Sequence, residues 1–91
     1  MKIRWSVHAA NDFLTIIEYI RNDNPTAADR VVQLIHKGIS RLSKFPNSGR
    51  VGRVSSTREL VVSPLPFILV YRVTEDFVEL IRVLHGAKKW P

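Results

Sequence analysis

The segment 47–53 constrains the fold of this chain more than any other feature, because the spacing of apolar residues changes across it. Before the segment, apolar residues recur at the three- and four-residue spacing of one helical face. After it, β-branched and aromatic residues dominate in short runs, which is typical of strands. The segment itself is rich in turn-forming residues. The sequence therefore predicts an α+β fold, with helices in the first half and a sheet in the second.

Two helices are expected in the first half. Ser6 can cap a helix that runs from about Val7 to Arg21. Asn24-Pro25 is a second start signal, because asparagine caps free N–H groups and proline suits the first helical position. Pro46 ends this second helix. Since the connection between the helices is so short, we expect a helical hairpin.

Four strands are expected around this hairpin. Lys2 to Trp5 alternates polar and apolar residues and predicts a short first strand. Three more are expected at Arg58 to Ser63, Phe67 to Val73 and Phe77 to His85, and their short connections imply an antiparallel meander. The expected order is β-α-α-β-β-β, with the helices packed on one face of the sheet. A chain of 91 residues cannot build a second core, so residues 1–91 should form a single domain.

The last two expected strands are apolar on both faces. In Phe67 to Tyr71 and in Leu80 to Leu84, apolar residues occupy positions of both parities, whereas a sheet with one wet face alternates apolar and polar residues. Two helices cover only one face of such a sheet. The other face is then left for a partner, or it is covered by loops or by the tail of the chain.

Positive charge is concentrated in the middle of the chain. The sequence has 14 basic and 8 acidic residues, and no acidic residue lies between Asp29 and Glu59. Half of the basic residues fall in that interval, namely Arg30, Lys37, Arg41, Lys44, Arg50, Arg53 and Arg58. Such a surface binds nucleic acid or an acidic protein, or it is simply a hydrated face. Charge alone does not distinguish these three interpretations.

Several classes of protein are disfavoured. The chain has no cysteine, so disulfides and thiolate chemistry are absent, which fits a reducing compartment. His8, His36 and His85 are too far apart in sequence to predict a metal site, and no cofactor is expected. No apolar run approaches the roughly 20 residues that cross a bilayer, and the N-terminus lacks the apolar core of a signal peptide. A cytoplasmic protein without a membrane partner is expected.

Basic residues and a histidine gather near the C-terminus, at Arg82, His85, Lys88 and Lys89. Histidine can transfer protons near neutral pH, and cations can stabilise the transition state of RNA cleavage. Arg82 and His85 are therefore the catalytic candidates if the chain is an RNase. The alternative, which the spacing alone favours, is that these two pair with neighbouring groups while the lysines solubilise the tail. Trp90 either anchors that tail on the rest of the chain or remains exposed for contact with a partner.

Across nearly its whole length the chain resembles the RelE/ParE family of toxins from bacterial type II toxin–antitoxin systems. The strongest matching motifs are Arg58-Glu59-Leu60-Val61-Val62, Val70-Tyr71-Arg72-Val73 and Arg82-Val83-Leu84-His85-Gly86-Ala87-Lys88-Lys89-Trp90-Pro91. Weaker ones are Tyr19-Ile20, Asn24-Pro25-Thr26-Ala27-Ala28 and Phe45-Pro46-Asn47-Ser48-Gly49-Arg50-Val51-Gly52. The resemblance implies a helical hairpin on an antiparallel sheet. It also implies a cytoplasmic antitoxin that neutralises the toxin and carries the complex to operator DNA.

The ending of the chain is more similar to the ParE branch, which is associated with inhibition of DNA gyrase, than to the branch that cleaves messenger RNA on the ribosome. RNA-cleaving members need an arginine in the strand equivalent to Phe67 to Val73 and a tyrosine or histidine near the C-terminus. The matching strand position here is Ile68, and Gly86 follows His85. The resemblance thus favours a growth-inhibiting gyrase poison that is not an enzyme. A ribosome-dependent endoribonuclease and an inactive relic that only binds antitoxin remain the alternatives.

Two sets of binding residues follow from these readings. Contacts with the target or with nucleic acid are predicted for Arg50, Arg53, Arg58, Lys88, Lys89 and Trp90. Contacts with the antitoxin, through the uncovered face of the sheet, are predicted for Phe67, Leu69, Tyr71 and Leu80.

Overall fold

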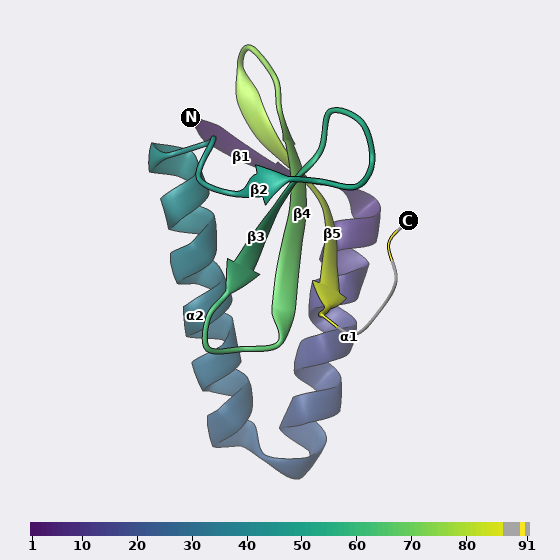
Figure 1. The fold of residues 1–91 in the computed structure, drawn as a ribbon. Helices are drawn as coiled ribbons and strands as arrows, with labels where there is room; N and C mark the ends of the chain where they lie inside the picture. Colours follow the sequence, from purple (N-terminus) through teal and green to yellow (C-terminus); the bar gives the residue numbers. More distant parts are fainter. Residues whose placement is uncertain (87–89, 91) are drawn as a thin grey trace.

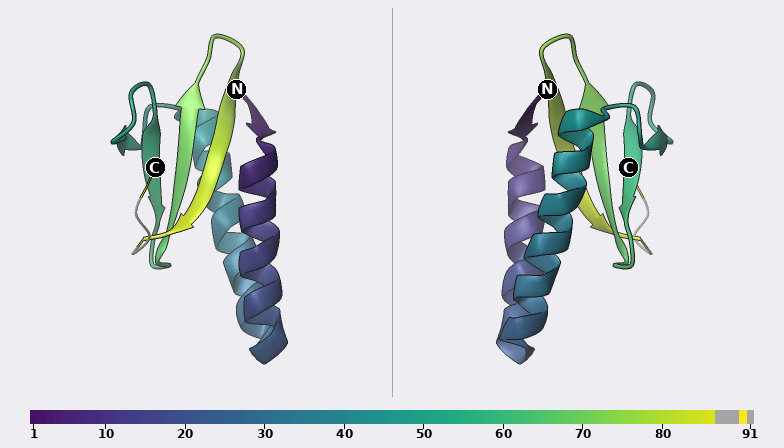
Figure 2. Two further views of the ribbon diagram at one scale, coloured as in Figure 1. Left: turned by 90° about the vertical axis from the view of Figure 1, so that its right-hand side faces the viewer. Right: turned by 90° about the vertical axis from the view of Figure 1, so that its left-hand side faces the viewer.

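A hairpin of two helices covers one face of a five-stranded sheet in the computed structural model, which describes residues 1–86 and 90 (Figures 1 and 2). The elements, in chain order, are β1 (Lys2–Trp5), α1 (Val7–Asp23), α2 (Pro25–Lys44), β2 (Arg50–Val51), β3 (Arg58–Val62), β4 (Phe67–Val73) and β5 (Phe77–His85). The α+β class and the order of the predicted elements are confirmed. The two-residue strand β2 was not predicted, and α1 runs two residues past the expected Arg21.

The strand order in the sheet is β1-β5-β4-β3-β2. The pairs β2 with β3, β3 with β4 and β4 with β5 are antiparallel, which confirms the meander, whereas β1 runs parallel to β5. A register shift lies between Val70 and Tyr71, because these residues pair with Arg82 and Leu80 and leave Ile81 between them. An extra residue of this kind turns the side chains that follow it to the opposite face. The shift explains why Leu80 and Val83, three positions apart, both face the core.

Local hydrogen bonds fix the ends of the helices. The Ser6 hydroxyl accepts a hydrogen bond from the Ala9 N–H at 3.0 Å, as expected for a cap. Asn24 serves both helices, because its own N–H donates to the Ile20 carbonyl while its side chain accepts from Ala27 N–H at 3.0 Å. The hairpin therefore turns within a single residue, and its tip extends past the end of the sheet (Figure 1). Neither helix is long and apolar enough to cross a membrane.

The core lies between the hairpin and the sheet. It contains Ala28, Val31, Ile35, Ile39 and Leu42 of α2, together with alternate residues of the central strands. The four residues predicted to contact an antitoxin belong to this core, since Leu69, Tyr71 and Leu80 are 0% exposed and Phe67 is 7% exposed. That prediction assigned them to the wrong face of the sheet. They pack against the helices, and no partner can reach them in this structure.

Candidate functional site

The face of the sheet that points away from the helices carries a groove. Ile68, Val70 and Leu84 belong to this far face, because they alternate with core residues along their strands. The groove has a volume of about 590 Å³ and is lined by Arg50, Val51, Gly52, Arg53, Glu59, Ile68, Val70, Leu84, Gly86 and Trp90. We call it the far-face groove. Its floor is apolar and its wall near the β2 loop is basic.

Trp90 and the β2 loop cover part of the far face. Val70 and Leu84 are only 1% and 5% exposed, although they lie outside the core that packs against the helices. The chain itself therefore covers these two residues of the far face. Trp90 is half-buried, and the guanidinium carbon of Arg82 lies 5.9 Å from the centre of the Trp90 ring. Within the described residues, its enclosed Nε1 has no hydrogen-bond acceptor. Trp90 therefore anchors on the sheet while keeping an unused donor.

The structure brings only some of the predicted basic residues to the far-face groove. Arg50 and Arg53 line it, and Arg50 forms a 2.9 Å ion pair with Glu59. Arg58 instead donates to the carbonyl oxygen of Gly49 at 2.9 Å, so it holds the loop before β2. The predictions for Lys88 and Lys89 fall outside the residues that the structure describes.

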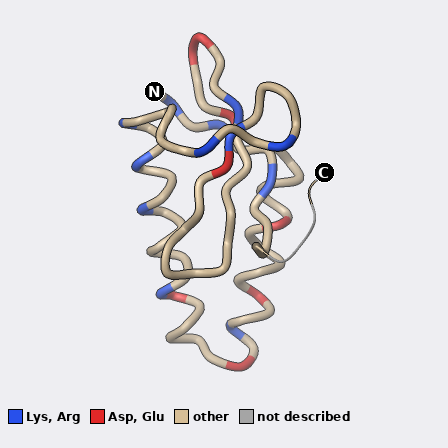
Figure 3. The backbone as a smooth tube through the Cα atoms, viewed as in Figure 1, with Lys and Arg blue, Asp and Glu red and all other residues tan. Residues whose placement is uncertain are grey.

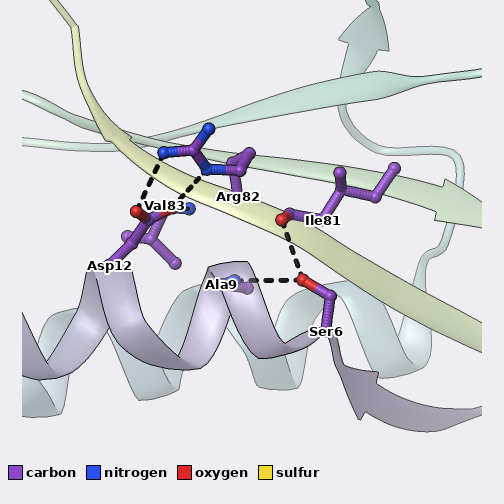
Figure 4. Close-up of polar contacts among 6 residues, drawn as sticks. All are labelled: Ser6, Ala9, Asp12, Ile81, Arg82 and Val83. Carbon is purple, nitrogen blue, oxygen red and sulfur yellow. Dashed lines mark hydrogen bonds and ion pairs between the residues drawn. The ribbon is translucent and has the colours of Figure 1, made fainter.

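Arg82, one of the two catalytic candidates, is bound to α1 (Figure 4). Its Nε and one terminal nitrogen donate to the two carboxylate oxygens of Asp12 at 2.7 and 3.0 Å. The same carboxylate accepts the Val83 N–H at 3.0 Å. Both side chains are largely screened from solvent, at 26% and 18% exposed. The Asp12 hydrogen bond raises the pKa of Arg82 above its ordinary value, so the guanidinium stays charged and paired.

Asp12 and Ser6 form hydrogen bonds with the backbone of β5 beyond the point where β1 ends. β1 pairs with β5 only as far as Leu80. Beyond that point the Ser6 hydroxyl donates to the Ile81 carbonyl at 2.9 Å, and Asp12 satisfies the Val83 N–H (Figure 4). No sequence pattern pointed to Asp12, because it lies 70 positions from Arg82 and inside an ordinary amphipathic helix.

His85, the other catalytic candidate, lies at the far end of β5. It pairs with Phe67 in the sheet, and the two rings meet edge to face with centres 5.8 Å apart. Its side chain is exposed. Since the Arg82 guanidinium is directed toward α1, the structure does not assemble the two candidates around one point.

A buried tyrosine shapes the loop beside the groove. The Tyr71 hydroxyl donates to the Pro46 carbonyl at 2.7 Å and accepts from the Gly49 N–H at 2.9 Å. Burial raises the pKa of Tyr71, while the Gly49 hydrogen bond and the positive charge of Arg58 partly oppose that rise. The motifs of β4 and of the loop, far apart in sequence, thus meet in space and position Arg50 at the start of β2.

A second groove lies between α2 and the edge of the sheet at β3. It has a volume of about 680 Å³, and its lining includes Lys37, Arg41 and Lys44 of α2, then Phe45, then Leu60 to Val62 of β3. We call it the α2–β3 groove. Arg50 and Glu59 line both grooves, so their ion pair forms a common wall. Figure 3 shows basic residues along the C-terminal half of α2 and around β2, with few acidic residues near them.

Comparison with known proteins gives consistent matches over nearly the whole chain. Residues 3–90 match the family described as ParE toxin of type II toxin-antitoxin system, parDE. A Sinorhizobium fredii protein named toxin Y4kP is 43% identical over 90 residues, covering 99% of this chain and 93% of that protein. Toxin RelE2 of Caulobacter vibrioides is 31% identical, covering 96% of this chain and 97% of that protein. A ParDE system structure from P. aeruginosa superposes with a TM-score of 0.85 at 26% identity, over 93% of this chain and 95% of that chain.

Proposed function

Since the chain belongs to the ParE toxin family of type II toxin–antitoxin systems, and therefore has an antitoxin as partner, we propose that it arrests growth by binding and inhibiting DNA gyrase. In this proposal the toxin acts as a protein ligand and not as an RNase. A protein ligand needs a shaped surface with anchoring side chains, whereas an RNase needs a proton donor or acceptor and a free cation around one phosphate.

The pairing of Arg82 with Asp12 carries the proposal. Two hydrogen bonds from Arg82 to the Asp12 carboxylate compensate the positive charge of the guanidinium, and moving the guanidinium to a phosphate would break both of these bonds to a half-buried carboxylate. The position where RNA-cleaving relatives are expected to carry a strand arginine is Ile68, on the floor of the far-face groove. These residues favour binding over cleavage.

The far-face groove is the surface that we assign to the target. It combines an apolar floor with Trp90, Arg50 and Arg53 at its walls, and tryptophan and arginine are the residues that most often dominate protein–protein binding energy. A half-buried tryptophan beside arginines therefore supports an anchor for gyrase.

A supercoiling assay with purified gyrase tests the proposal. The intact toxin should inhibit supercoiling, and Trp90→Ala and Arg53→Glu should weaken inhibition by about tenfold or more each. Trp5→Ala and Arg30→Glu are matched controls, since they change an exposed tryptophan and an exposed arginine outside the groove. Absence of inhibition by folded toxin in excess over gyrase would contradict the proposal.

Ribosome-dependent RNA cleavage is the second candidate, because the same groove also suits a single-stranded nucleic acid. A base can stack on Trp90 while Arg50 and Arg53 contact phosphates. Growth arrest should then be accompanied by cleavage of messenger RNA during translation, with supercoiling unaffected. That cleavage should be lost in Arg82→Ala with His85→Ala if these residues carry it. Harmless overexpression of folded toxin would instead indicate a relic that only binds antitoxin.

A further inference from the structure

The edge of the sheet beside the α2–β3 groove is open. β2 pairs with β3 only at Arg58 and Glu59. In the part of the chain that the structure describes, no strand pairs with Leu60 to Val62 on the side away from β4. An open strand edge carries backbone groups that can pair with another extended chain. Here those groups border a groove of about 680 Å³ instead of bare solvent.

The groove has an apolar part that is incompletely buried. The Phe45 side chain is large and apolar, and it is 63% exposed. Leu60 also lines the groove and is partly buried against the core. Such exposed apolar surface, next to open backbone groups, is the combination that strand-adding peptides use for affinity and specificity.

The rim of the groove is positively charged. Lys37, Arg41 and Lys44 lie along it, and no acidic partner pairs with them among residues 1–86 and 90. The single carboxylate of the lining, Glu59, is already bound to Arg50 at 2.9 Å. The rim therefore has an excess of positive charge that an acidic segment would balance. In addition, the enclosed Ser48 hydroxyl lines the groove without a hydrogen-bond partner among the same residues.

We propose that the antitoxin binds here through an extended segment that alternates acidic and apolar residues and adds to the sheet as a strand beside Leu60 to Val62. Its apolar side chains cover Phe45 and Leu60, and its carboxylates face Lys37 and Arg41. A strand fits better than a helix, because only an extended segment can satisfy the open backbone groups of β3. The inference rests on the antitoxin partner of the family and is independent of whether gyrase is the target.

Amide hydrogen exchange on the toxin, alone and bound to its cognate antitoxin, tests where the strand is added. Exchange at amides within Leu60 to Val62 should slow on binding, because some of them gain acceptors and all lose contact with water. The opposite edge of the sheet, Lys2 to Trp5 in β1, is the internal comparison and should change little. Protection at β1, or along the outer surface of α1, with none in Leu60 to Val62 would overturn the proposal.

Binding measurements with substituted toxin test the chemistry of the groove. Phe45→Ala should raise the Kd of the antitoxin complex by about tenfold or more, whereas Tyr19→Ala, an exposed aromatic of α1, should leave it unchanged. The double change Lys37→Glu and Arg41→Glu should also raise the Kd. Its control, Lys2→Glu with Arg30→Glu, alters net charge equally outside the groove.

Each outcome of these measurements is decisive. If both double variants weaken the complex equally, overall charge and not the groove attracts the antitoxin, and the proposal fails. If Phe45→Ala binds normally while its circular dichroism is unchanged, the apolar part of the groove is not the docking site. Because gyrase takes no part in these measurements, a failed docking proposal and a failed target proposal are distinguishable.

Discussion

At the scale of single residues, Tyr71 and Gly49 decide the shape of the loop before β2. Tyr71 is 0% exposed, and its hydroxyl both donates and accepts a hydrogen bond in that loop. Gly49 has to be a glycine for a steric reason, since a Cβ there would lie 2.7 Å from the Tyr71 oxygen and 2.8 Å from the Glu59 carbonyl oxygen. This contact joins the loop motif at residues 45–52 to the strand motif at residues 70–73.

Tyr71→Phe should lower the free energy of unfolding by about 1–3 kcal/mol, because the Pro46 carbonyl and the Gly49 N–H lose a buried partner. Burial raises the pKa of Tyr71 above its ordinary 10.0, so the folded protein keeps this proton where the unfolded chain has lost it. The stability contributed by the neutral hydroxyl is therefore complete below pH 10.0 and declines as the pH rises further. Urea denaturation at several pH values should show the difference between the two proteins shrinking above pH 10.0. A constant difference would contradict this account.

Gly49→Ala and Gly38→Ala should have opposite effects. At Gly49 the added methyl group would overlap the backbone at Glu59, so we expect destabilisation of about 1–3 kcal/mol. At Gly38, inside α2, the methyl group would meet Leu69 Cδ1 at 3.4 Å, an ordinary contact, and alanine is favoured over glycine in a helix by about 1 kcal/mol. Thermal melting of both variants checks the pair. Equal destabilisation by the two would contradict the steric argument.

At the scale of elements, the sequence predicted what depends on local periodicity. Both helices and four strands were found because their apolar spacing and their caps, such as Ser6 and Asn24, are local signals. β2 was missed since two residues are too few to show alternation. The register shift at Val70 and Tyr71 depends on pairing between strands, so no local signal predicts it. The face of Leu69 and its neighbours was assigned wrongly for another reason, since β4 is apolar at positions of both parities and alternation does not show which parity faces the helices.

The site was less predictable than the fold, because its decisive contacts join distant segments. Arg82 and His85 were identified by residue type, but Asp12, which holds Arg82, was not. For Trp90, the sequence suggested two roles, anchoring of the C-terminal tail and contact with a partner. The structure places Trp90 among the residues that line the far-face groove. Residue type thus predicted which residues belong to the site, but not which residues they contact.

Asp12 joins α1 to the edge of β5, so its loss should loosen that packing. Asp12→Ala leaves the Arg82 guanidinium and the Val83 N–H without their acceptor, and we expect the free energy of unfolding to fall by about 1.5–3 kcal/mol. Asp12→Asn should cost less, because its amide oxygen can still accept one of these hydrogen bonds. Chemical denaturation compares the two. Equal losses from both variants would show that charge pairing with Arg82, and not the hydrogen bond to Val83, accounts for the stability.

At the scale of the whole molecule, the hairpin and sheet form a core that does not need the C-terminal residues. The buried cluster extends from Ala9 to Val83, and Trp90 packs outside it on the far face. Deleting residues 88–91 should therefore reduce toxicity strongly while lowering the melting temperature by only a few degrees. Growth assays and melting curves of the truncated protein check this. A truncated toxin that folds, binds antitoxin and remains fully toxic would show that the tail is dispensable.

The shared wall of the two grooves links what happens on either side of it. Because Arg50 and Glu59 line both, an occupant of the α2–β3 groove that draws on either charge alters the far-face groove without entering it. Linkage requires the converse, so a target seated on the far face must change the affinity for the antitoxin by the same factor. If the antitoxin neutralises the toxin by this route, it lowers the affinity for the target through the shared wall and does not need to cover the far-face groove. A toxin that is already bound to its target then binds its antitoxin less tightly.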